Sequence, residues 1–106
     1  MTPDRGDVVW VTVEPENDGQ KVARRAALVV SPAHYNSRAR LALMCAIAPS
    51  AKGYPFEVAL PENLPVRGVV LADHLRSADW EARRAELACR VPAGVVAEVL
   101  AKLKPL

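Results

Sequence analysis

The 106-residue sequence lacks the features of a membrane-bound or exported protein. No apolar run approaches the roughly 20 residues that a membrane-spanning helix needs. The first residues are polar and carry no signal-peptide core. A hydrophobic fraction of 51% with 25% charged residues is typical of a globular chain and excludes a disordered one. We therefore expect one soluble, cytoplasmic domain that spans residues 1–106.

Cysteine is scarce. Cys45 and Cys89 are the only two, and neither a CxxC pair nor a histidine at zinc-site spacing accompanies them. Cys45 lies in an apolar run, where a small buried hydrophobic side chain is the expected role. A disulfide is not expected in a reducing cytoplasm. The sequence therefore predicts no metal site and no cofactor.

Common catalytic motifs are missing as well. There is no P-loop, no GxGxxG and no GxSxG, and His34 and His74 have no nucleophile beside them in the sequence. The net charge of +2 is too small to indicate nucleic-acid binding by itself. The arginines are clustered, however, as Arg24 with Arg25, Arg38 with Arg40, and Arg83 with Arg84. Each cluster could be a solvated surface, but clusters that converge on one face could hold an RNA backbone.

Short apolar runs dominate the first four fifths of the chain, at residues 8–13, 26–30, 41–48, 56–60 and 69–72. Each is rich in Val, Leu and Ala and bounded by Pro, Gly, Asn or Asp, which is typical of strands. Residues 84–91 alternate roughly and predict a further strand. The close spacing leaves room for hairpins but not for helical crossovers, so we expect a mainly β fold, a small antiparallel barrel.

Two loops and a helix complete the expected organisation. Residues 14–24 and 48–54 contain Pro, Gly, Asn or Ser and read as loops, where binding groups often lie. From Pro92 the apolar residues recur with helical spacing, and Pro105 ends the pattern. We predict a C-terminal helix over residues 92–104. Its apolar stripe is wide enough to cover the barrel and to leave surface for a second copy, so we expect a homodimer.

Five segments follow one another in a specific order: GDVVWV at 6–11, RAALVVSP at 25–32, YN at 35–36, KGYPFEV at 52–58 and GVVLADHLRS at 68–77, closed by Trp80. In this order and spacing the chain resembles the MazF/PemK family of toxin endoribonucleases over most of residues 6–80. The resemblance implies an SH3-like barrel with a C-terminal helix and a homodimer that cuts single-stranded RNA, mainly mRNA, at short motifs. The implied products, made without metal, are a 2′,3′-cyclic phosphate and a 5′-OH. The implied partner is an antitoxin whose acidic, flexible tail occupies the RNA groove.

Such cleavage needs positive charge on the pentacoordinate phosphate, together with a base and an acid that the sequence does not identify. Arg25 begins an apolar strand, its planar fork suits phosphate oxygens, and the resemblance assigns the family's catalytic arginine to it. The family's proline after this arginine is Ala26 here. Its catalytic threonine falls, by ungapped counting, at Ala48. Ser50 lies two residues later, and it is either the replacement hydroxyl or an ordinary turn serine.

The remaining candidates form an expected RNA-binding surface. Tyr54 can stack on an unpaired base, whereas Phe56 and Trp10 are expected in the core. Trp80 fits either the core or a partner surface. Asp73, His74 and Arg76 are expected just after a strand, with His74 a possible proton donor. The full set of expected RNA contacts is Gln20 (acidic in close relatives), Arg24, Lys52, Tyr54, Asp73, His74 and Arg76.

Two other functions compete with RNA cleavage. A gyrase-poisoning toxin shares the implied fold, but the retained Arg25 and the segments at 52–58 and 68–77 count against it. A non-catalytic module for single-stranded RNA is favoured by the missing threonine and proline. The RNA cleavage motif and the identity of the antitoxin depend on loop conformations and a partner that the sequence does not specify.

Overall fold

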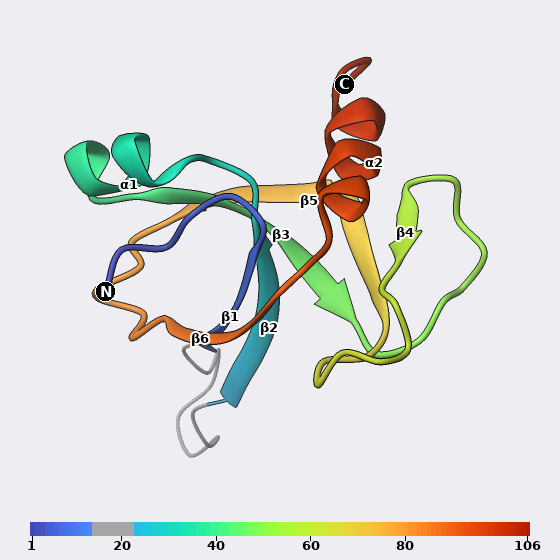
Figure 1. Ribbon diagram of the computed structural model, residues 1–106, viewed down its shortest axis with the longest axis horizontal. Coiled ribbons are helices and arrows are strands. Elements are labelled where there is room, and N and C mark those ends of the chain that lie inside the picture. Colours follow the sequence, from blue (N-terminus) through green and yellow to red (C-terminus); the bar gives the residue numbers. More distant parts are fainter. Residues whose placement is uncertain (14–22) are drawn as a thin grey trace.

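The computed structural model describes residues 1–13 and 23–106. Along the chain lie β1 (Asp7–Val13), β2 (Ala23–Val29), α1 (Ala33–Ala39), β3 (Ala42–Ala48), β4 (Glu57–Ala59), β5 (Val69–Ala78), β6 (Glu86–Arg90) and α2 (Ala93–Leu103). The six strands form one antiparallel sheet in the order β4-β5-β3-β2-β1-β6. This sheet curls into a half-barrel, and α2 packs against β5 and β4 (Figure 1). The expected mainly β barrel with a C-terminal helix is confirmed.

The curled sheet has two faces with separate cores, because successive side chains of a strand point to opposite sides. We call the first the helix-covered face, which packs against α2 and includes Val8, Leu28, Cys45, Val70 and Val99. We call the second the Trp80 face, which includes Val9, Val11, Ala27, Val29, Met44 and Trp80. The inner strands are apolar at successive positions because both of their faces are packed.

The helix α2 begins and ends one residue inside the predicted range. Pro92 precedes its first turn, and Val96 and Val99 are buried, with Val99 in the core of the helix-covered face. Leu100, on the same stripe, stays 36% exposed. Near the other end, Lys102 Nζ donates to the Pro55 carbonyl over 2.8 Å. No described helix has the length and apolarity that a membrane crossing requires.

A second helix, α1, was not predicted because it has no apolar stripe. It has seven residues and ends at Arg40, whose φ of 62° is left-handed. A buried polar residue holds it: Asn36 Nδ2 donates to the carbonyls of Pro3 and Ser31. Trp80 Nε1 donates to the Asn36 carbonyl over 3.1 Å, which places Trp80 in the core. Trp10, by contrast, is 37% exposed, so the prediction that it is a core residue is wrong.

Strand boundaries correct two other expectations. The strand β5 continues to Ala78, so Asp73, His74 and Arg76 lie within it and do not follow it. The second half of β5 is exposed and rich in polar residues. The register of its pairing with β3 shifts between Cys45 and Ile47. The strand β2 begins at Ala23, so Arg24 is a strand residue and not part of a loop.

Candidate functional site

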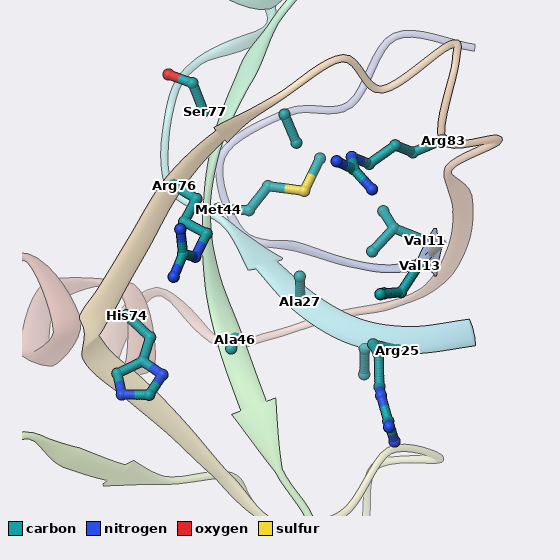
Figure 2. Close-up of a pocket in the computed structure, with 12 residues that line it drawn as sticks. Val11, Val13, Arg25, Ala27, Met44, Ala46, His74, Arg76, Ser77 and Arg83 are labelled. Carbon is teal, nitrogen blue, oxygen red and sulfur yellow. The ribbon is translucent and has the colours of Figure 1, made fainter. Parts of the chain in front are cut away.

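A groove of about 330 Å³ opens on the Trp80 face. Its floor is apolar, with Val11, Ala27 and Met44 at the centre, and basic side chains stand around it (Figure 2). The described residues around the groove include no Asp and no Glu. The complete lining is Val11, Val13, Arg25, Ala26, Ala27, Met44, Ala46, His74, Arg76, Ser77, Ala78 and Arg83. A groove with this lining suits an anionic ligand that also carries flat apolar surface.

Arg25 lies at one end of the groove. It stands on β2 opposite Val11, and its side chain shares the Trp80 face with Ala27, as strand alternation requires. The pairing of β2 with β3 ends at Ala27 and Ala46, two residues short of Arg25 on β2 and of Ala48 on β3. Ala48, the position to which the resemblance assigns the threonine, carries only a methyl group and is not among the residues that line the groove.

Two further predicted residues reach the groove from β5. Arg76 is paired with Met44, and His74 lies nearer the Arg25 end, beside Ala46 (Figure 2). Asp73 is exposed and does not line the groove. Burial raises the pKa of the Cys45 thiol to about 11, and the Asp73 carboxylate adds to the shift. Cys45 is thus a neutral core residue, as predicted.

Arg24 points away from the groove, because it alternates with Arg25 along β2. Its guanidinium donates to the carbonyls of Trp10 over 3.0 Å and Arg84 over 3.3 Å. It also lies 3.8 Å from the Glu86 carboxylate on β6. Arg24 therefore does not line the groove with Arg25, since its side chain is held against the neighbouring strands, and its contact with RNA stays a prediction.

The loop after β3 places its candidates outside the groove. Ser50 lines a separate pocket of about 420 Å³ together with Arg67 and Gly68. Lys52 is exposed, and its backbone N–H donates to the Glu57 carboxylate over 3.0 Å.

The aromatic residues of the same loop follow the predictions. Tyr54 is 63% exposed, as expected for a stacking residue. Phe56 packs against the core of the helix-covered face, also as expected. The last candidate, Gln20, lies outside the described residues.

Arg83 reaches the groove although it was not among the candidates. The sequence signal was the adjacent pair with Arg84, but a pair does not say which member faces a site. The turn after β5 decides it: Thr12 N–H donates to the Arg83 carbonyl over 2.8 Å, and Arg83 Nη1 donates to the Thr12 carbonyl over 3.3 Å. Among the described residues, no three His, Cys, Asp or Glu side chains are grouped so that they could hold a metal ion.

The chain is similar to known toxins along most of its length. Residues 4–106 match the family described as PemK-like, MazF-like toxin of type II toxin–antitoxin system. The endoribonuclease toxin MazF of Escherichia coli K12 is 40% identical over 83 residues, which are 78% of this chain and 74% of that protein. The endoribonuclease PemK of Escherichia coli is 30% identical over 108 residues, covering 97% of this chain and 80% of that protein.

Solved structures agree with this relationship. A crystal structure of MazE–MazF from Deinococcus radiodurans superposes with a TM-score of 0.95 at 50% identity, covering 99% of this chain and 95% of that chain. An endoribonuclease from a mycobacterial species, solved with its cognate antitoxin, has the same fold at 18% identity, with a TM-score of 0.77 over 97% and 92% of the two chains. The chain therefore belongs to the family of PemK-like, MazF-like toxins of type II toxin–antitoxin systems.

Proposed function

We propose that this toxin is an endoribonuclease that cleaves single-stranded RNA, mainly mRNA, at short motifs, with the scissile phosphate held at the Arg25 end of the groove. The observation that carries the proposal is the environment of the Arg25 guanidinium. It is exposed at a groove whose described lining contains no carboxylate, and it makes no hydrogen bond or ion pair with any described residue. The guanidinium of Arg24, one residue away, is instead bound by protein oxygens.

The proposed reaction uses the ribose 2′-oxygen as nucleophile. As the 2′-OH loses its proton to a base, the oxygen attacks the adjacent phosphorus and the bond from phosphorus to the 5′-oxygen breaks. The 5′-oxygen takes a proton, so the products are a 2′,3′-cyclic phosphate and a 5′-OH. Arg25 stabilises the charge that develops on the phosphate oxygens, since its guanidinium stays charged at all relevant pH values. His74 lines the same groove and is a candidate proton donor.

The catalytic hydroxyl that the resemblance implies at the end of the third strand is missing, because Ala48 occupies that position. We propose that Ser50 supplies it. Ser50 lies two residues further along the chain, in the exposed loop that follows β3. Because Ser50 lines a different pocket from Arg25, its hydroxyl reaches the scissile phosphate only if residues 49–52 shift when RNA binds.

We further propose a cytoplasmic homodimer inhibited by an acidic antitoxin. Similar toxins have been crystallised as MazE–MazF and with a cognate antitoxin. Three exposed apolar side chains of this chain, Tyr35, Leu75 and Leu100, line one groove of about 440 Å³ between α1 and α2. A second copy would cover them. The remaining contacts proposed for RNA are Gln20, Lys52 and Tyr54.

The direct test is cleavage of defined single-stranded RNA by the purified protein in EDTA. We expect cleavage with a 2′,3′-cyclic phosphate and a 5′-OH at the new ends, identified by mass spectrometry. Activity that EDTA abolishes would contradict the mechanism. Inhibition of gyrase supercoiling without RNA cleavage would favour the gyrase-poisoning alternative, and binding without cleavage would favour the RNA-binding module.

A further inference from the structure

The groove has a second basic end, opposite Arg25. Figure 2 shows Arg76 on one side of Met44 and Arg83 on the other, while Arg25 lies beyond Ala27 at the far end. Arg76 is paired with Met44, whereas Arg25 lies two residues beyond Ala27, which is paired with Ala46. Two residues of β3 and then two residues of β2 separate the two positions, roughly 13 Å along extended strands. One phosphate cannot lie against both ends of the groove.

Arg83 is held at its end by the fold. Trp80 is buried beneath the same turn and donates to the Asn36 carbonyl, and Ala85 N–H donates back to the Trp80 carbonyl over 2.9 Å. The Arg83 guanidinium donates one bond, to the Thr12 carbonyl. Its remaining N–H groups have no acceptor among the described residues. A guanidinium placed this way is prepared for an anion, because little side-chain freedom is lost when it binds.

The floor between the two ends is suited to the apolar part of a nucleotide. Val11 and Ala27 are nearly buried at 8% and 6%, so they form a packed surface and not a mobile one. Met44 lies between Arg76 and Arg83, where the floor reaches the second end, and its unbranched thioether adapts to a flat ring. A phosphate at either end with an apolar floor between them matches the alternation of charge and base along a single strand.

We propose that Arg76 and Arg83 form a second phosphate subsite, which binds a backbone phosphate of the RNA other than the scissile one. The nucleotide between the two phosphates packs over Ala27, which lies between the Met44 end and the Arg25 end of the groove. This inference rests on the proposed RNA cleavage, because it takes Arg25 as the scissile end. In this arrangement the Arg25 end takes part in cleavage, and the end with Arg76 and Arg83 positions the RNA strand.

The first experiment measures binding without cleavage. A single-stranded DNA oligonucleotide has no 2′-OH and serves as an uncleavable probe. Arg76→Ala and Arg83→Ala should each weaken its binding roughly tenfold. Each should also reduce the slope of log K against log salt by roughly 0.7, the value for one phosphate on a single strand. Arg83→Lys should keep the slope, since it keeps the charge. Arg38→Ala, an exposed arginine on α1, is the matched control and should change neither quantity.

The second experiment locates the phosphate. A set of oligonucleotides each carries one uncharged methylphosphonate, at a different position. With the parent protein, two positions should weaken binding. In Arg76→Ala or Arg83→Ala, one of those two should lose its effect, while the other keeps it. On RNA, the same variants should raise KM and leave kcat within about twofold, because the subsite binds ground state and transition state alike.

Three outcomes would overturn the proposal. The salt slope could be the same for Arg76→Ala, Arg83→Ala and Arg38→Ala. The methylphosphonate profile could be identical in parent and variants. The two variants could bind the probe normally but lose affinity for an acidic peptide, which would make this end a protein site. Because the probe is not cleaved, these results do not depend on whether the protein cuts RNA.

Discussion

The two faces of the sheet use alternate residues of the same strands but differ in what covers them. The helix-covered face is closed by α2, and its central residues Val8, Leu28 and Val99 have no exposed surface. Trp80 packs against one end of the Trp80 face. No described helix covers the part around Met44 and Ala27, where the groove lies with arginines around it. One face therefore supplies most of the closed core, and the other supplies a groove.

Arg24 and Arg25 show the same difference on the scale of two residues. Arg24 is bound by the carbonyls of Trp10 and Arg84, so its charge serves to hold β2 against its neighbours. Arg25 faces the groove and has no described partner. The comparison indicates that the face of the strand, and not the presence of an arginine, decides whether a charge is available to a ligand.

The largest expected effect is on stability and tests the helix-covered face. Leu28→Ala should lower the free energy of unfolding by about 2–5 kcal/mol, because the cavity that it leaves is sealed by α2 and the sheet. Met44→Ala should cost less, since the space that it vacates opens into the groove. Urea unfolding followed by circular dichroism measures both, with the exposed Leu87→Ala as control. Equal losses for Leu28 and Met44 would contradict the difference between the faces.

The next effect is on RNA cleavage and tests the groove on the Trp80 face. Arg25→Ala should reduce the rate of RNA cleavage on the order of 10²-fold or more, the cost of removing one group that stabilises developing charge. The free energy of unfolding should stay nearly unchanged, because the side chain holds no described residue. Single-turnover cleavage and urea unfolding check the two parts. A variant that cuts at the parental rate would remove Arg25 from the mechanism.

A smaller effect tests the junction where β5 meets the end of β3. Gly68 has a φ of +125°, and a Cβ there would lie 1.9 Å from the Ala48 carbonyl oxygen. Gly68→Ala must displace the backbone at Ala48, the position to which the resemblance assigns the catalytic threonine, so we expect a loss of roughly 1–3 kcal/mol in stability together with slower cleavage. Gly53→Ala is the control, because its φ of +85° is also unfavourable but its Cβ would meet nothing within 4 Å. If both variants cut RNA equally well, the close approach at Gly68 does not position the site.

The smallest effect concerns the missing hydroxyl. Ser50→Ala should slow turnover roughly tenfold while leaving RNA affinity nearly intact, if its contact forms in the transition state. Ala48→Thr restores a hydroxyl at the position to which the resemblance assigns it and provides the comparison. Parental turnover in Ser50→Ala with faster turnover in Ala48→Thr would show that Ser50 does not replace the threonine. Single-turnover kinetics with a fluorescent RNA separates these outcomes.

Much of the architecture could be predicted from the sequence, because it depends on local patterns. Apolar runs bounded by turn residues predicted the strands, and the spacing of Val95, Val96, Val99 and Leu100 predicted α2 to within one residue at each end. The order of motifs at residues 6–80 indicated the toxin family, which the comparisons confirm. Arg25 was singled out because it begins an apolar run and because the resemblance assigns the family's catalytic arginine to it.

Other features depend on long-range contacts and were settled only in the folded structure. The helix α1 is held by Asn36 through bonds to Pro3 and Trp80, residues far away along the chain. Arg24 and Arg25 are alike in sequence, and only strand alternation and the neighbouring β6 separate their roles. Arg83 joins the groove because its turn is bonded to Thr12, 71 residues earlier in the chain. Local sequence determines which segments become strands and helices, whereas the faces that meet across the sheet determine which charges gather at one site.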